Sequence, residues 1–340
     1  MFKTKCSQSS QLGLLLAFIV TFLMVILLSG CTGESKPKVY RVGVLSGLSF
    51  VASITDGFKE GMTELGYVEG ENIVYDVQQT DFDMEAYRSV LQQFVADKVD
   101  LIVVYPTEAT IEAKMATEGT DIPVLFAFAL IEDMGIVDSI REPGGNITGV
   151  RYPGVDVALK RFEILHELVP DATRILVPYQ RGYPIVQPQL ESLRPIAEAA
   201  GVTLVEAPAD NGTELGSILQ EYVTADGVSF DAVLALVEPL SVAVDAYPVM
   251  VSFMAEHQLP FGGAYVPEGD YRPLFGVNVD VWNSGYQSAT LADKIFQGID
   301  PGTIPVASAE TYLEIDYKMA EMLGLTVPEE LLALADEVYR

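Results

Sequence analysis

The residues with reactive side chains are few, and one of them suggests a covalent modification. Cys31 ends the sequence Leu-Ser-Gly-Cys, which follows two lysines near the start of the chain and an apolar run over residues 12–28. Small residues before the cysteine fit a peptidase groove, and the thiol freed by the cut can accept a diacylglycerol group. We therefore expect residues 1–30 to be a lipoprotein signal peptide, Cys31 to carry the lipid, and residues 31–38 to be a tether.

An uncleaved transmembrane anchor is the alternative for residues 12–28, because about 17 to 20 apolar residues are enough to span a bilayer. The Leu-Ser-Gly-Cys sequence at the membrane face favours cleavage and lipidation. We expect the protein at the cell membrane, anchored by the lipid on Cys31 and facing the extracytoplasmic side, in the periplasm or at the cell surface.

The other reactive side chains argue against metal and thiol chemistry in the exported part. Cys6 lies in the segment that would be removed, and only His166 and His257 could supply imidazoles. Zinc and copper sites need clustered cysteines or histidines, so we expect no metal, no cofactor and no disulfide. The formal charge of 20 minus 48, or −28, becomes −30 once the two signal lysines are removed. Such a surface repels phosphate, so we expect no nucleic acid partner.

From Val39 onward, short β-branched runs alternate with amphipathic helices. Apolar strands joined by helices predict parallel sheets with helices on both faces. A domain of roughly 300 residues tends to split its core in two, so we expect an α/β fold of two doubly wound lobes joined by a hinge. In the first lobe the predicted strands are 41–46, 72–77, 101–105 and 124–128, and the helices are 54–65, 84–96 and 111–117. In the second lobe the strands are 174–178, 203–206 and 232–236, and the helices are 157–168, 186–200, 214–223 and 242–257.

A turn-rich break at residues 143–146 separates the two series. Gly144 and Gly145 in this break suit a left-handed backbone, which other residues adopt at a cost. The break is therefore either the first crossing between the lobes or a surface turn, and we favour the crossing.

Several short motifs occur in the order and spacing of one known family. They are Gly57, Phe58, Gly61, residues 65–67, Gly70 and Asn72; residues 98–103, 121–124 and 143–149; Asp280, Gly285, Leu291, Ala292, Ile295 and Gly298; and residues 320–325 before Pro328. Together they resemble the ABC transporter substrate-binding lipoproteins that include the tryptophan and tyrosine uptake proteins. The resemblance covers essentially all of the exported chain.

This resemblance implies a periplasmic-binding-protein fold of type I, in which the chain crosses between the lobes three times. It implies that lobe 1 consists of residues 39–147 plus about 276–303. Lobe 2 would then consist of residues 148–275 plus about 304–340.

Ligands of parallel sheets bind beyond the carboxyl ends of the strands, where the loops diverge. This rule selects the loops at 46–53, 106–110 and 128–131 in the first lobe, 180–183, 238–241 and 263–265 in the second, and the returning segment 278–282. The candidate ligand-binding residues in these loops are Ser46, Ser49, Thr107, Phe128, Leu130, Arg181, Tyr183, Glu238, Tyr265, Asn278, Asp280 and Trp282.

The polar candidates each have two possible roles. Ser46, Ser49 and Thr107 could donate hydrogen bonds to a ligand carboxylate, or they could cap helices. Glu238 could hold a ligand ammonium group, or it could only stabilise the start of a helix. Arg181 is the one cation in these loops, and it could equally be a solvated charge at the edge of its lobe.

The aromatic candidates could stack on a flat ligand or cover an apolar one. They are Phe128, Tyr183, Tyr265 and Trp282, the only tryptophan in the chain. Packing in the core is the alternative role of each, and of Trp282 in particular.

The chain departs from the family pattern after the fourth predicted strand. Family members usually carry an Asp-Pro pair there, whereas this chain has Leu130 and Ile131. Glu132 or Asp133 could substitute after a small shift of the loop. The simpler inference is a changed and less polar ligand, so that an aromatic amino acid is only one of the candidates.

No feature of the sequence indicates catalysis. There is no Gly-x-Ser-x-Gly motif and no cysteine nucleophile, and both histidines lie inside predicted helices, so we expect no enzyme. We expect instead a monomeric substrate-binding protein of an ABC importer, which captures a small molecule between its lobes and delivers it to the permease and its ATPase. A lipoprotein that presents a bound ligand to a signalling receptor is the alternative, and the sequence does not separate the two.

Overall fold

The computed structural model describes residues 38–264 and 269–340. The expected signal peptide, the lipidation residue Cys31, nearly all of the tether and the candidate Tyr265 lie outside the described residues. Residues Tyr40–Arg340 form one compact unit.

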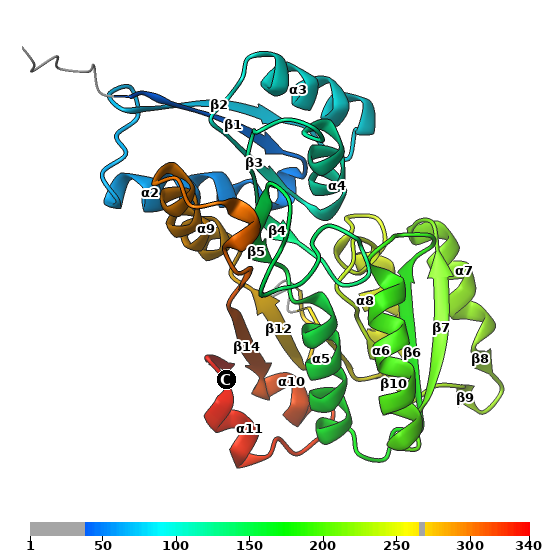
Figure 1. The fold of residues 1–340 in the computed structure, drawn as a ribbon. Coiled ribbons are helices and arrows are strands. Elements are labelled where there is room, and N and C mark those ends of the chain that lie inside the picture. The colour runs from blue at the N-terminus through cyan, green and yellow to red at the C-terminus, as the bar shows by residue number, and fades with distance from the viewer. Residues whose placement is uncertain (1–37, 265–268) are drawn as a thin grey trace, which may run out of the picture. The chain divides into compact units, whose positions relative to one another are not determined.

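A six-stranded parallel sheet forms lobe 1, in the order β13-β5-β4-β3-β1-β2 (Figure 1). The residues of its inner strands are apolar on both faces, as a sheet covered on both sides requires; all five residues of β3 are buried. The strands are β1 (Tyr40–Ser46), β2 (Ile73–Gln79), β3 (Leu101–Tyr105), β4 (Val124–Ala129), β5 (Ile147–Arg151) and β13 (Ala307–Ser308).

Helices cover both faces of this sheet (Figure 1). On one face lie α2 (Ser53–Glu64) and α9 (Val281–Phe296), and on the other lie α3 (Met84–Ala96) and α4 (Thr107–Ala116). The helix α4 begins four residues earlier than predicted, so that Thr107 and its neighbours form a helical turn and not a loop.

Glycines bring the backbones of α2 and α9 into direct contact. A Cβ atom on Gly57 would lie 2.0 Å from the carbonyl oxygen of Trp282, and one on Gly285 would lie 1.9 Å from that of Ile54. Interiors are packed too densely to absorb such an overlap without separating the helices. The motif glycines at these positions therefore have a packing role.

Lobe 2 contains a four-stranded parallel sheet and a three-stranded one. The orders are β11-β10-β6-β7 and β12-β14-β15, and β12 pairs with β14 in antiparallel orientation. The strands are β6 (Arg174–Gln180), β7 (Thr203–Ala209), β10 (Ala232–Leu234), β11 (Phe261–Gly262), β12 (Phe275–Val279), β14 (Thr311–Asp316) and β15 (Glu337–Tyr339). A short hairpin of β8 (Val223–Thr224) and β9 (Gly227–Val228) was not predicted.

Six α-helices complete this lobe, and α5 packs against α6 as α7 packs against α8. They are α5 (Gly154–Leu168), α6 (Val186–Ala199), α7 (Gly212–Glu221), α8 (Tyr247–His257), α10 (Tyr317–Met322) and α11 (Glu329–Leu334). The short 3-10 helices in the described part of the chain are η1 (Ser49–Val51), η2 (Leu240–Val242) and η3 (Pro301–Thr303). Within the described residues, none of the helices combines the length and the apolar composition that crossing a membrane requires.

The predicted α/β class with doubly wound parallel lobes is confirmed, but one helix was predicted too long. The helix predicted at 242–257 begins only at Tyr247, because η2 ends at Val242 and Ala243 has an extended backbone. Pro248 then occupies the first turn of α8, where the absence of an N–H does no harm.

The points at which the chain passes between the lobes differ from the expected boundaries. The strand β5 extends the lobe 1 sheet to Arg151, four residues past the expected end at 147. The side chains of Phe275 and Val277 in β12 belong to the core of lobe 2, and the return to lobe 1 begins only with α9. After β13 the chain enters lobe 2 for the last time through β14.

Gly144 and Gly145 do not form the first crossing. Both have positive φ angles and lie in a turn before β5, where the Gly144 N–H donates to the carbonyl oxygen of Gly302 at 3.0 Å. The hinge interpretation of this turn was therefore wrong, and the left-handed glycines serve a turn within lobe 1.

The three crossing segments are hydrogen-bonded to one another. The N–H of Ala309 donates to the carbonyl oxygen of Arg151 at 3.0 Å, and that of Asp280 donates to Glu310 at 3.1 Å. The Arg151 side chain also forms ion pairs with Glu132 of lobe 1 and with Asp156 of α5 in lobe 2. The connection between the lobes is thus a set of adjacent, mutually bonded segments.

Candidate functional site

Unpaired polar groups gather at the carboxyl ends of β1, β2 and β3. Ser46 is the last residue of β1 and is buried, Thr80 follows β2, and Glu108 lies in the first turn of α4 after β3. The hydroxyl oxygens of Ser46 and Thr80 and both carboxylate oxygens of Glu108 are buried without a hydrogen-bond partner. Buried polar atoms are nearly always paired in folded proteins. Their occurrence together indicates a place where a bound molecule would supply the missing partners.

Backbone bonds and one tyrosine hold these groups close to each other. The N–H of Thr80 donates to the carbonyl oxygen of Ser46 at 2.9 Å, and the Tyr87 hydroxyl donates to that of Gly47. Thr80 and Glu108 both affect the pKa of Tyr87, although the Thr80 hydroxyl is not oriented to complete a hydrogen bond with it. Burial is the main reason that the pKa of Tyr87 rises to about 12, and the Glu108 charge adds to the rise.

The Ser46 hydroxyl has one polar neighbour that is already engaged. The Tyr105 hydroxyl lies 2.6 Å from that of Thr55. Ser46 is near enough to lower the pKa of Tyr105, which burial raises, but the two hydroxyls do not meet in hydrogen-bond geometry. The Ser46 hydroxyl therefore remains available to another group.

Tyr183 of lobe 2 reaches the same place. Its ring meets the Phe82 ring of lobe 1 edge to face, with 6.2 Å between the centroids. Burial raises the pKa of Tyr183, and the Glu108 charge raises it further; the Tyr183 hydroxyl approaches Glu108 without completing a hydrogen bond. Burial also raises the pKa of the Glu108 carboxyl, against a lowering by Tyr183. We call Ser46, Thr80, Tyr87, Glu108 and Tyr183 the edge cluster.

At the corresponding edge of lobe 2, Glu238 is buried and both of its carboxylate oxygens accept hydrogen bonds. Its carboxylate accepts hydrogen bonds from the N–H groups of Gln180 at 2.8 Å, Leu240 at 2.9 Å and Ser241 at 2.7 Å, and from the Ser241 hydroxyl. Burial raises its pKa while these donors lower it. Of the two roles considered for Glu238, the structure places it in the helix-stabilising one, where it also ties η2 to the end of β6.

Arg181 is likewise engaged, at the outer edge of lobe 2. Its guanidinium forms ion pairs with Asp210 at 3.1 Å and with Glu214, and its side chain is 47% exposed. This is the arrangement of a solvated charge at the lobe edge, the alternative considered for Arg181.

Two polar candidates of lobe 1 have structural partners. Ser49 is exposed and donates through its hydroxyl to Asp81 at 3.2 Å. Thr107 is buried, and its hydroxyl oxygen accepts a hydrogen bond from the N–H of Leu130 at 3.0 Å. Leu130 itself is fully buried and packs against Gly154 at the start of α5. The Leu130 side chain thus contributes apolar packing next to the first crossing.

The aromatic candidates lie in different places. Phe128 is half-buried, stacks on Tyr152 with 4.5 Å between the ring centroids, and packs against the cores of both lobes. Trp282 lies in α9 and stacks on Tyr286 at 5.4 Å, in the helix pair of α2 and α9. Only Tyr183 reaches the edge cluster by the contacts given above.

Asn278 and Asp280 lie at the second crossing. The Asn278 amide donates to Glu314 at 2.8 Å. Asp280 is exposed and accepts a hydrogen bond from the N–H of Asn283 at 2.9 Å, which caps α9. Both side chains are thereby assigned to the connection between the lobes.

Thr80, Tyr87 and Glu108 were not among the ligand-binding residues predicted from the sequence. The loop after the second strand was left out of the ligand loops, although the same rule about carboxyl ends applies to it. Glu108 lay inside the selected loop at 106–110, but its nearest partners are visible only in the fold. A carboxylate directly after a strand, with no basic residue within four positions, was the available signal.

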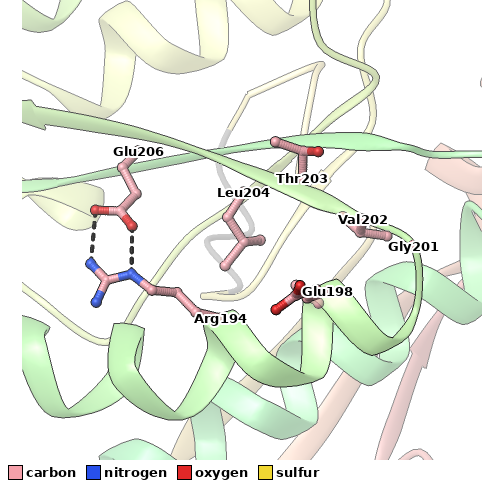
Figure 2. A pocket seen from close by; sticks show the side chains of 8 residues that line it. Arg194, Glu198, Gly201, Val202, Thr203, Leu204 and Glu206 are labelled. Carbon is pink, nitrogen blue, oxygen red and sulfur yellow. Dashed lines mark hydrogen bonds and ion pairs between the residues drawn. The ribbon is translucent and has the colours of Figure 1, made fainter.

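A groove of about 490 Å³ lies elsewhere in lobe 2, between α6 and the start of β7 (Figure 2). Figure 2 shows the Arg194 guanidinium turned toward the Glu206 carboxylate, with which it forms two hydrogen bonds of 2.8 and 3.1 Å. The groove begins at the amino end of β7, and its one arginine is already paired with Glu206. We therefore do not assign the ligand to it. No group of histidine, cysteine, aspartate and glutamate side chains in residues 38–264 and 269–340 is arranged to hold a metal ion.

Known proteins resemble this chain over most of its length. A curated tyrosine-binding protein of Clostridioides difficile (strain R20291) is 26% identical over 281 residues, which cover 82% of this chain and 78% of the relative. The structure of a conserved domain protein from Vibrio cholerae O1 biovar eltor strain N16961 superimposes with a TM-score of 0.74 at 25% identity, covering 88% of this chain and 100% of that one. The ABC domain of Streptococcus pneumoniae in complex with L-Trp gives a TM-score of 0.73 at 25% identity and the same coverage.

The family assignment agrees with these relatives. Residues 42–339 match the family described as ABC transporter substrate binding protein, which is nearly all of the described chain. Members of such a family bind substrates and do not transform them, in agreement with the expectation that the chain is no enzyme. With its two doubly wound lobes and its unpaired polar groups at the carboxyl ends of the strands, this chain belongs to the family of ABC transporter substrate-binding proteins.

Proposed function

We propose that this protein is the membrane-anchored, extracytoplasmic binding component of an ABC importer, which captures a small molecule between its lobes and delivers it to the permease. Family membership supports the binding role. The observation that carries the choice of site is the edge cluster, in which side-chain oxygens of Ser46, Thr80 and Glu108 are buried without a hydrogen-bond partner. A ligand that satisfies these groups gains interactions for which no protein group competes.

The position of Tyr183 links ligand binding to the approach of the lobes. Tyr183 belongs to lobe 2, yet it contacts Phe82 and lies beside Glu108, which both belong to lobe 1. A ligand held at the lobe 1 edge would touch Tyr183 only when the lobes are close together. Such a ligand favours the closed arrangement by its additional contacts there.

The names of the relatives suggest the compounds to test first. One relative is a tyrosine-binding protein, and another was solved in complex with L-Trp. Phe82, Tyr87 and Tyr183 place aromatic rings at the edge cluster, and such rings stack well on flat ligands. Aromatic amino acids and their close analogues are therefore the first candidates.

The proposed anchor is a lipid on Cys31. The Leu-Ser-Gly-Cys sequence after the apolar run supports it, and a binding protein must stay close to its permease. Mass spectrometry of the N-terminal peptide tests this directly. A peptide that begins at Cys31 and carries the mass of acyl chains is expected, and an intact segment before Cys31 would refute the anchor.

Ligand binding is tested on the exported protein, purified from membranes in mild detergent. Its thermal unfolding is measured against a panel of amino acids, amines, nucleobases and small acids, since a selective ligand raises the melting temperature by mass action. The variant Ser46→Ala should reduce the shift, whereas Ser49→Ala, at an exposed serine three residues later, should not. The absence of a shift with every compound would refute the receptor role.

A further inference from the structure

We propose that Glu108 binds the positively charged group of the ligand, and that this ligand is an organic amine whose recognition does not require a carboxylate. The inference rests on the proposed receptor function and specifies the chemistry of the same site. It starts from one feature of the edge cluster: a carboxylate without any partner of opposite charge.

An arginine that reaches α4 from the neighbouring helix forms an ion pair with a different acid. Arg88 of α3 forms two hydrogen bonds, of 2.9 and 2.7 Å, with Glu112, one helical turn beyond Glu108. Neither carboxylate oxygen of Glu108 has a donor, although both are buried. Burying an unpaired carboxylate is costly, and its pKa rises accordingly. A cationic ligand would remove this cost, whereas a neutral or anionic ligand would leave it or increase it.

The arginines near the facing edges of the lobes are not free to bind a ligand carboxylate. Arg151 forms ion pairs with two carboxylates, and so does Arg181. Arg161 is buried in lobe 2, where its guanidinium donates to the carbonyl oxygens of Val277 and Ala235 at 2.8 to 3.1 Å. The segment 265–268, outside the described residues, contains no lysine or arginine. A ligand carboxylate at the edge cluster would therefore meet the unneutralised Glu108, while these three arginines are held by other groups.

The remaining members of the edge cluster suit an ammonium group. An ammonium has three donors and no acceptor, so it needs several oxygens around it. The Glu108 carboxylate offers two, and the hydroxyls of Thr80 and Tyr183 lie in the same cluster. The Phe82 ring, which is 37% exposed and meets Tyr183, adds an aromatic face beside the charge.

The experiment compares the binding of three compounds that share a 4-hydroxyphenylethyl group to the exported protein: tyramine, tyrosine and 3-(4-hydroxyphenyl)propionate. Binding is measured by isothermal titration on wild type, Glu108→Gln, Glu108→Asp and Glu118→Gln. Glu118 is an exposed acid just beyond the end of α4, so its variant removes the same charge from a place away from the cluster. Melting temperatures establish that each variant is folded.

We expect wild type to bind tyramine at least as tightly as tyrosine, and the amine-free acid not at all. Removing one partner of a buried charge pair lowers affinity by about 30-fold or more, which is the loss expected for tyramine with Glu108→Gln. Glu108→Asp should retain part of the affinity, and Glu118→Gln all of it.

The outcomes separate this inference from the receptor function. Binding of the propionate or full tyramine affinity in Glu108→Gln would refute the role of Glu108. Binding of tyrosine without binding of tyramine would refute the claim that no carboxylate is required. Each of these outcomes would leave the receptor function intact. If the wider panel produces a ligand without an amine, the amine inference also falls. If no compound binds wild type, the receptor function fails and this inference fails with it.

Discussion

At the carboxyl edge of lobe 1, the side-chain oxygens of Ser46, Thr80 and Glu108 are buried without hydrogen-bond partners. At the matching edge of lobe 2, the Glu238 carboxylate accepts four hydrogen bonds. The same rule selects both edges as places for a ligand, so position alone does not distinguish them. What distinguishes them is whether the protein has already satisfied its own polar groups. Lobe 2 uses the Glu238 carboxylate to hold its loops, whereas we propose that the Glu108 carboxylate of lobe 1 binds the ligand.

The largest effect on stability is expected from Glu238→Ala. This change leaves three buried N–H groups without their acceptor, and such losses cost about 3 kcal/mol of the free energy of unfolding. Thermal unfolding followed by circular dichroism should show a melting temperature lower by roughly 6 °C. Glu256→Ala, at an exposed acid of α8, is the matched control. An unchanged melting temperature in Glu238→Ala would mean that the lobe 2 edge is not held by this carboxylate.

A smaller contrast is expected between two hydroxyl residues of the lobe 1 edge. Thr107→Val removes the acceptor of the Leu130 N–H and should cost about 1 to 2 kcal/mol. Ser46→Ala removes a hydroxyl that has no partner and should change the free energy of unfolding by less than about 0.5 kcal/mol. Urea denaturation of the two variants measures both values. Equal losses would show that Ser46 has a partner within the protein.

Glu108→Gln is expected to act in the opposite direction and to stabilise the ligand-free protein by about 1 kcal/mol at neutral pH, because an amide costs less to bury than an unpaired charge. Burial raises the folded-state pKa of Glu108 above its ordinary value of 4.5. The contribution of its protonated form to the free energy of unfolding is therefore complete below 4.5, and it is lost as the pH rises through the raised pKa. Tyr87 and Tyr183, which face it, also have raised pKa values and stay neutral in this range.

The melting temperature of Glu108→Gln should therefore exceed that of wild type at neutral pH, and the difference should disappear at acid pH. Melting temperatures between about pH 4 and pH 8 measure it, in a range that brackets the ordinary pKa of glutamate. A variant that is less stable than wild type at neutral pH would indicate that Glu108 has a favourable partner in the free protein.

The smallest effect is expected from Arg181→Gln. Both of its ion pairs are at the surface, and exposed pairs contribute about 0 to 1 kcal/mol. Its melting temperature and its affinity for tyramine should match those of wild type. A loss of affinity would indicate that Arg181 binds the ligand, and that the lobe 2 edge contributes polar contacts as the lobe 1 edge does.

Much of the fold could be predicted from the alternation of apolar runs. The strand at 101–105 and the helix at 84–96 agree with the structure at both ends, because each carries an uninterrupted pattern. The helix predicted from 242 failed because its first residues are apolar, and an apolar pattern does not reveal that η2 and an extended segment precede α8. The strand β5 was missed because Ile147–Arg151 directly follows a turn that resembled a domain boundary.

The candidate site was predicted by its loops and not by its chemistry. Ser46 and Tyr183 were selected as residues at strand ends, and the structure brings both to the edge cluster. Glu238 and Arg181 were selected by the same rule, but the structure gives them partners within the protein. Whether a polar side chain is free depends on partners far away in the chain, such as Gln180 for Glu238. Such pairings depend on the tertiary structure, and a local sequence pattern does not predict them.

The bonded crossings between the lobes restrict how the two halves can move. Since Ala309 is bonded to Arg151 and Asp280 to Glu310, sliding one crossing along another would break backbone hydrogen bonds. Rotation about an axis that runs through these segments changes a few dihedral angles and leaves those bonds in place. We therefore expect a hinge rotation about this axis to be the main motion between the lobes. Such a rotation would separate Tyr183 of lobe 2 from Phe82 of lobe 1.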